Sequence, residues 1–190
     1  MTYYGAKHLA DSFRTVRKNT LAIAEDIPED KYGFKAAPEV MSVGEMLAHL
    51  AVSPMWQIDV HGKKVAALDF AFFGARMAQG KMEEQALLTK AQIVAALKAN
   101  GERFATFLEG LDEATLESTV SFPPPVQPPV KSRFEMLLGP KEHEMHHRGQ
   151  LMLVQRMLGQ VPHLTRARQQ MQAQAAGRAE FYPLARSGGR

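Results

Sequence analysis

The chain has 190 residues, 45% of them hydrophobic and 23% charged, which is typical of one globular domain with a substantial core. It has no cysteine, which excludes a disulfide framework, a thiolate metal ligand and a cysteine nucleophile. The net charge is +3, but residues 163–190 contain five arginines and a single acid, Glu180, so the remainder is close to neutral. A DNA-binding domain usually carries its positive charge on a folded face, so nucleic-acid binding is not expected.

The sequence also argues against a membrane protein. The first residues lack the apolar core of a signal peptide, and no stretch approaches the roughly 18 apolar residues that suggest a membrane span. The expected location is therefore cytoplasmic.

The first predicted helix covers residues 6–26. Apolar positions recur from Leu9 to Ile27 at alternating steps of four and three, which places them on one stripe of a helix. The helix is expected to end before Pro28, and the following residues are turn formers without periodicity.

The second predicted helix begins at a capping box made by Ser42 and Glu45. It is expected to run to about His61 and to stop at Gly62. Pro54 lies inside this helix, and we expect it to kink the helix because its ring clashes with the carbonyl group one turn earlier.

Residues 63–88 are apolar without one clean period, which predicts at most a short helix between the main elements. The phenylalanines of this segment are expected in the core or at a subunit contact. The third long helix begins at a second capping box, Thr89 with Gln92, and its apolar stripe continues to Leu111.

A proline-rich crossover, residues 123–129, contains five prolines and must be extended. The fourth helix is expected to start at Ser132 and to continue to about Leu158. Four long amphipathic segments with long connections predict an all-α four-helix bundle over residues 1–163. Residues 164–190 are then a basic polar C-terminal tail.

The fourth helix contains three histidines within five positions, in the string HEMHH. A helical residue turns about 100°, so His147 lies about 40° from His143 on the core-facing stripe, whereas His146 diverges by about 60° to the other side. Two imidazoles one turn apart on such a stripe can chelate one metal ion. A pair His143/His146 and a solvated basic patch are the alternatives, but a basic patch does not require the apolar neighbours.

A third ligand should come from another helix and face the core. His49 shares its stripe with apolar residues in the second turn of a capped helix, which selects His49, His143 and His147. The string also satisfies H-E-x-x-H, the zinc protease pattern with Glu144 as general base. The metzincin extension fails because Gln150 stands where a glycine is required, and no sheet is evident to hold a peptide.

The segments MSVGEMLAHL and EHEMHHRGQLMLVQRMLG, followed by GQVP, resemble the DinB/YfiT family of four-helix-bundle metalloproteins over about residues 5–163. The resemblance implies an up-down-down-up bundle and a divalent metal ion, usually zinc or nickel, bound at the positions of His49, His143 and His147. It also implies a homodimer, which the apolar residues 65–73 favour as well. The proline-rich crossover and the arginine-rich tail depart from the family's simplest pattern.

The resemblance implies a metal-dependent enzyme of the thiol-S-transferase or hydrolase type that acts on a small molecule. A low-molecular-weight thiol would then enter as a cosubstrate, since the chain has no cysteine. Glu144 and His146 are the candidates for moving protons at the rim of the site. The alternative is a non-catalytic metal-binding module for stress response or interaction.

Overall fold

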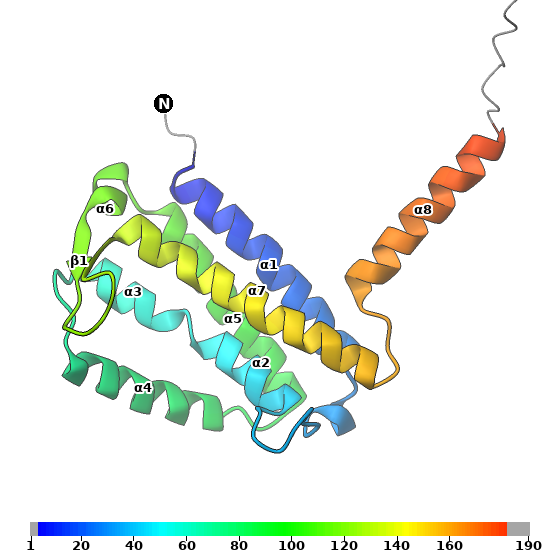
Figure 1. Cartoon of the computed structure of the whole chain (residues 1–190), viewed down its shortest axis with the longest axis horizontal. Helices are drawn as coiled ribbons and strands as arrows, with labels where there is room; N and C mark the ends of the chain where they lie inside the picture. Colours follow the sequence, from blue (N-terminus) through cyan, green and yellow to red (C-terminus); the bar gives the residue numbers. More distant parts are fainter. Residues whose placement is uncertain (1–3, 182–190) are drawn as a thin grey trace, which may run out of the picture.

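Four long helical segments lie side by side and form the body of the molecule (Figure 1). The computed structural model describes the backbone of residues 4–181 and the side chains of residues 4–176. The four segments are α1 (Ala6–Asp26), α2 (Val43–Val52) continued by α3 (Met55–Gly62), α5 (Lys90–Glu109) and α7 (Arg133–Met157). α1 and α7 run in one direction and α2, α3 and α5 in the other, so the predicted up-down-down-up four-helix bundle is confirmed.

The apolar stripes predicted for these helices form the core. In α1, Leu9, Phe13, Val16 and Ile23 are buried, as the alternation of four and three predicts. Phe13 meets Phe104 of α5 edge to face with the ring centroids 4.9 Å apart. The helix packing is thus established by residues that the sequence already places on one face.

The predicted helix starts are confirmed. Ser42 and Thr89 each accept a hydrogen bond from the amide three residues later, and the side-chain oxygen of that later residue accepts one from the backbone N–H of the cap. Ser132 accepts from the amide of Glu135 at 3.1 Å. These caps satisfy amide groups that a helix leaves without partners at its first turn.

Pro54 interrupts the second segment completely, so the predicted kink is a break between α2 and α3. Proline has no N–H to donate to the carbonyl oxygen of Leu50. Arg17 donates to that oxygen at 2.8 Å instead, and Asn100 donates to the carbonyl oxygen of Ala51 at 3.0 Å. Side chains of α1 and α5 therefore replace the missing helical bonds.

Residues 63–88 form a longer helix than the sequence predicts. α4 (Phe70–Gln85) begins at Asp69, whose carboxylate accepts from the amide of Phe72 at 2.7 Å. The helix lies along the outside of α2 and α3 (Figure 1). It has no fully buried residue, which explains why its sequence lacks one clear apolar stripe.

The crossover between α5 and α7 contains more structure than an extended chain. A short helix, α6 (Glu113–Glu117), is followed by β1 (Thr119–Ser121) and β2 (Val130–Ser132), which pair antiparallel. The predicted proline-rich residues 123–129 form the connection between the two strands. Val120 of β1 is buried, so this hairpin covers one end of the bundle. A 3-10 turn (Glu29–Lys31) lies in the earlier connection.

The C-terminal tail begins as a helix, α8 (His163–Phe181), which points away from the bundle in Figure 1. Arg166 near its start pairs with Asp26 of α1 at 2.8 Å. Residues 182–190 and the side chains of Arg178 and Glu180 lie outside the described residues. The division of the chain into a bundle and a tail at residue 163 stays a prediction. Within the described part of the chain, no helix is both long and apolar enough to cross a membrane.

Candidate metal centre

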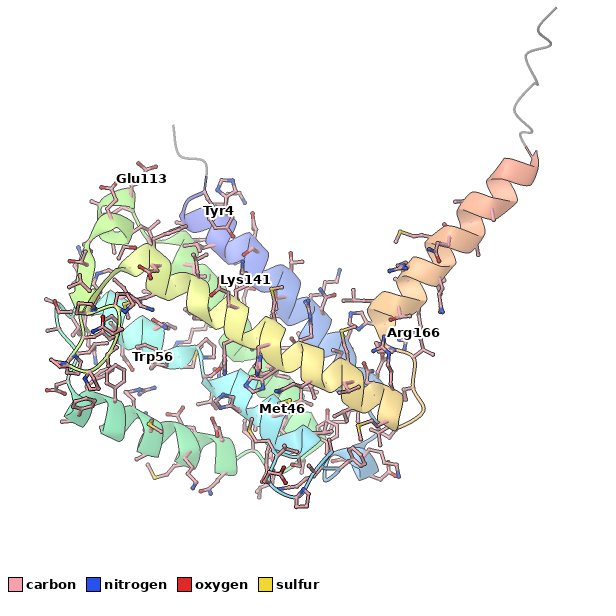
Figure 2. All side chains as sticks on the ribbon, viewed as in Figure 1. Tyr4, Met46, Trp56, Glu113, Lys141 and Arg166 are labelled. Carbon is pink, nitrogen blue, oxygen red and sulfur yellow. The ribbon has the colours of Figure 1, made fainter. Side chains whose placement is uncertain are left out.

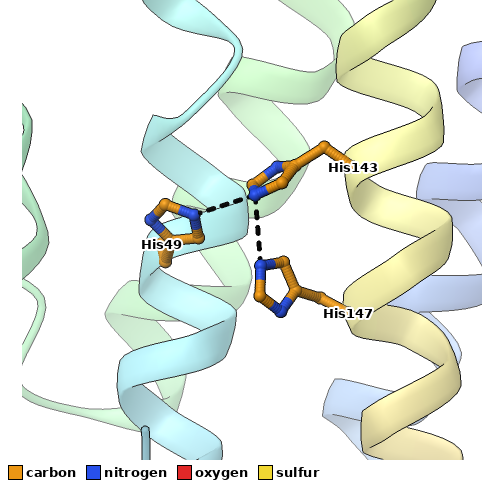
Figure 3. A group of neighbouring side chains, drawn as sticks. All are labelled: His49, His143 and His147. Atoms are coloured by element: carbon orange, nitrogen blue, oxygen red, sulfur yellow. Dashed lines mark hydrogen bonds between the residues drawn. The ribbon is translucent and has the colours of Figure 1, made fainter.

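Three histidine side chains from two helices converge between α2 and α7 (Figure 3). Nε2 of His143 lies 3.1 Å from Nε2 of His49 and 3.1 Å from Nε2 of His147. One ring nitrogen from each residue lies within 4.8 Å of the other two. The fold thus brings together the three residues that the sequence selects, with His143 and His147 one turn apart on α7.

The outer nitrogens of two rings are held by oxygen atoms. Nδ1 of His49 lies 2.7 Å from Oε1 of Glu84, on α4, and Nδ1 of His147 lies 2.8 Å from Oε1 of Gln150. Because both oxygens accept, each Nδ1 donates and each Nε2 presents a lone pair to the centre. If Nε2 of His143 carries a proton, it can donate to the lone pair of His49 or to that of His147, but not to both. A cation between the rings can accept a lone pair from all three Nε2 atoms. The donor set therefore fits an ion that prefers imidazole, such as zinc or nickel.

The environment of the triad favours neutral imidazoles. Burial, together with the neighbouring rings of His147, His49 and His146, lowers the pKa of His143 to about 4. Burial also lowers the pKa of His147, an effect that its hydrogen bond to Gln150 partly opposes. Neutral imidazole is the form that binds a metal ion, so these two rings are ready to do so at neutral pH.

Glu144 lies away from the rim where the sequence interpretation places it. The residue is 1% exposed, and its two carboxylate oxygens accept from Nε and Nη2 of Arg17 at 2.8–3.0 Å. Arg17 also donates to the carbonyl oxygens of Leu97 and Leu50. A carboxylate committed to a buried guanidinium is not available to a substrate, so we correct its role to a structural one that joins α1 to α7.

His146 lies on the exposed side of α7 and is not part of the triad. Its Nε2 accepts from the amide nitrogen of Gln150 at 3.2 Å. The same amide group holds Nδ1 of His147 through its oxygen, so His146 is linked to a triad residue through one side chain.

A cavity of about 480 Å³ opens beside His49, between α4 and the helices α2 and α3. His49 and Glu84 line one end, and Trp56 lines the wall formed by α3. A larger cavity of about 630 Å³ is also lined by Glu84, but its described lining residues include none of the triad. Of these two cavities, the smaller is therefore the one that borders the centre, through His49.

Two residues of the site could not be found by sequence reasoning. Glu84 lies 35 residues from His49, in a segment without a clear period, and only packing of α4 against α2 brings it to the ring. Arg17 comes directly after Val16 of the apolar stripe of α1, and nothing in the nearby sequence indicates that it pairs with Glu144, 127 residues away. Gln150 was detectable in principle, because residues three apart on a helix are neighbours.

Known proteins resemble this chain in sequence and in fold. The uncharacterized protein YjoA of Bacillus subtilis (strain 168) is 28% identical over 154 residues, which cover 81% of this chain and 91% of YjoA. The crystal structure of YjoA, a DinB-like protein, superposes with a TM-score of 0.61 at 23% identity, over 80% of this chain and 92% of that one. The DinB superfamily profile matches residues 12–151, which include the three histidines of the centre. By its sequence and its four-helix fold, the chain belongs to the DinB superfamily.

Proposed function

We propose that His49, His143 and His147 bind one divalent metal ion, zinc or nickel, and that the chain is a metal-dependent enzyme acting on a small molecule. The convergence of three Nε2 atoms, with neighbouring pairs 3.1 Å apart, is the observation that carries this proposal. Three protein ligands leave at least one position open on an ion that takes four to six. The cavity beside His49 supports catalysis over a purely structural role, because it offers a small molecule a binding space that borders one ligand of the ion.

The reaction type that we propose is thiol-S-transfer or hydrolysis. A divalent ion bound at such a site lowers the pKa of water or of a thiol and so supplies a nucleophile at neutral pH. The chain contains no cysteine, so the thiol would be a low-molecular-weight cosubstrate. The contribution of the protein itself is to fix the imidazoles: Glu84 and Gln150 hold the outer nitrogens of His49 and His147, and the cavity wall positions the substrate.

Metal content per chain in single variants tests the ligand assignment. His49→Ala, His143→Ala and His147→Ala should each lose most of the metal, because two imidazoles alone bind it weakly. His146→Ala is the matched control and should keep close to one ion per chain. Loss of metal in His146→Ala with retention in His147→Ala would instead assign the pair His143/His146.

Activity is tested on protein loaded with zinc or nickel. A panel of low-molecular-weight thiols is assayed against electrophiles, and a second panel of esters and amides is assayed for hydrolysis. Turnover that disappears in His143→Ala and survives in Glu142→Gln supports the enzyme. Stoichiometric metal without turnover in either panel would favour a non-catalytic metal-binding module.

A further inference from the structure

The cavity beside His49 has a polar end and an aromatic end. Its polar end is at His49 and Glu84, and its aromatic end is formed by Trp56, Phe72 and Phe73. The rings of Trp56 and Phe72 have centroids 6.4 Å apart, and those of Phe72 and Phe73 are 5.9 Å apart. Trp56 follows His49 by about two helical turns, roughly 10 Å along helical segments. Such a space suits one elongated molecule that carries an aromatic or branched apolar group.

Arg76 supplies a cation on the α4 wall of this cavity. Its side chain is 16% exposed, and one Nη donates to Gln79 at 2.8 Å and lies 3.3 Å from a carboxylate oxygen of Asp59. Its Nε is buried and has no hydrogen-bond partner among the described residues. An anionic oxygen is the acceptor that satisfies a guanidinium best, so a ligand carboxylate is the group that this cation of the lining would bind. Lys81 adds a second positive charge to the lining, and Glu84, which accepts from His49, is the one carboxylate among its described residues.

We propose that this cavity binds the substrate of the metal centre and selects an aromatic or branched apolar carboxylate. The apolar group packs on Trp56, Phe72 and Phe73, and the carboxylate pairs with the guanidinium of Arg76. The reacting end extends toward His49. As a statement about the substrate class, this inference rests on the function proposed above, but binding in the cavity can be measured without the metal.

Gly80 keeps the cavity open on the side of α2. A Cβ atom added at Gly80 would approach Cγ1 of Val52 at 4.0 Å, so a larger side chain there would point at the lining. Gly74, on the same helix, is exposed, and a Cβ atom added there would have nothing within 4 Å. Gly80→Leu therefore fills the cavity, and Gly74→Leu is the matched control that changes the same helix on its outer side.

Trp56 is the only tryptophan of the chain, and it lies on the side of α3 that faces α4 (Figure 2). Its fluorescence thus reports occupancy of the cavity. We would titrate phenylbutyrate and its neutral amide, phenylbutyramide, into chelator-treated and zinc-loaded protein and confirm the affinities by calorimetry. Phenylbutyrate should bind the wild type and Gly74→Leu equally, and Gly80→Leu at least about tenfold more weakly.

Arg76→Gln tests the recognition of the carboxylate. The variant should lower the affinity for phenylbutyrate about tenfold, because a charge-assisted hydrogen bond is lost. It should change the affinity for the amide by less than about threefold. Arg76→Lys should recover part of the affinity for the acid. Equal loss for acid and amide, or equal binding by Gly80→Leu and Gly74→Leu, would overturn the inference.

The two proposals fail in different ways. Stoichiometric zinc in protein whose Trp56 signal does not respond to the acid would overturn the cavity inference and leave the metal centre standing. The opposite result is a protein that takes up no metal but binds the acid in a way that depends on Gly80 and Arg76. It would support the cavity inference and overturn the proposed function.

Discussion

At the residue scale, the orientation of each imidazole determines whether the triad can bind an ion. His49 is part of α2, but its partner Glu84 belongs to α4, so two helices set the direction of one ring. Residues that hold the outer nitrogen of a ligand typically change metal affinity by a factor of about 10 to 100 when they are replaced. The affinity of the centre for a metal ion therefore depends on residues outside the triad.

Glu84→Gln should weaken zinc binding about tenfold while the stoichiometry at saturation stays at one ion per chain. The amide is a poorer acceptor than the carboxylate, so it holds Nδ1–H of His49 less firmly. Competition with a chromophoric chelator measures the affinity. Glu83→Gln is the control, because Glu83 accepts only from Gln79 among the hydrogen bonds found in the described residues. Equal affinities in the two variants would contradict the role of Glu84.

The buried pair of Arg17 and Glu144 should contribute to stability rather than to catalysis. Glu144→Gln leaves the guanidinium without a charged partner in a dry environment, which costs about 3 kcal/mol of unfolding free energy. Glu142→Gln changes an exposed residue of the same helix and should stay within about 0.5 kcal/mol of the wild type. Urea unfolding followed by circular dichroism compares them. A Glu144→Gln variant as stable as Glu142→Gln would refute this role.

At the scale of elements, one side chain, Arg17, both stabilises the break at Pro54 and holds α1 against α5. Arg17 donates to the carbonyl oxygen of Leu50 that Pro54 leaves free, and it also donates to the carbonyl oxygen of Leu97 on α5. It lies against Gly101, where a Cβ atom would come within 2.9 Å of Cγ of Arg17. The absence of a side chain at Gly101 thus makes room for the guanidinium.

Gly101→Ala should therefore destabilise the protein by about 1–3 kcal/mol, because the surrounding hydrogen bonds prevent Arg17 from moving away. An alanine normally stabilises a helix interior relative to glycine by about 0.5–1 kcal/mol. That gain is expected for Gly149→Ala on α7, where nothing lies within 4 Å. Thermal or urea unfolding should thus show shifts of opposite sign, and two shifts of the same sign would contradict the packing argument.

At the scale of the whole molecule, we expect a homodimer. Apolar side chains on α4, among them Phe70, Met77 and Met82, are more than half exposed in the single chain. Light scattering at micromolar concentration should return about twice the chain mass of 21.1 kDa. A mass close to that of one chain would refute the expectation.

The stability of the molecule should depend on pH through His61. Burial and the charge of Arg133 lower the pKa of His61 to about 4 in the folded state, below its ordinary value of about 6.5. The unfolded chain therefore binds the proton more readily, and the free energy of unfolding should fall as the pH drops through this window. Between pH 7 and pH 5, His61 should account for about 2 kcal/mol of the fall in the free energy of unfolding.

His61→Gln should lack that share of the pH dependence. Urea unfolding at the two pH values, in the presence of a chelator so that metal binding does not contribute, compares the variant with the wild type. Since other histidines titrate in both proteins, the difference between the two pH dependences isolates His61. Identical pH dependences would show that the buried ring is not the cause.

The helices of the bundle and the three histidines follow from the amino-acid sequence alone. A stripe such as that of α1, and caps such as Ser42 and Thr89, act within a few residues, and the spacing of His143 and His147 follows from helix geometry. Local interactions of this kind can be recognised along the chain. The choice of His49 also needed only its position on an apolar face.

The contacts that hold the three histidines and the broken second helix in place depend on the packing of the folded chain. The helix α4 buries no side chain completely, so its position is set by the surface of α2 and α3 and not by an apolar period of its own. Glu84 reaches His49 only because of that position, and the break at Pro54 is stabilised by Arg17, whose contacts are distant in the sequence. Partners brought together across 35 to 127 residues depend on the packing of whole helices, and local patterns do not contain that information.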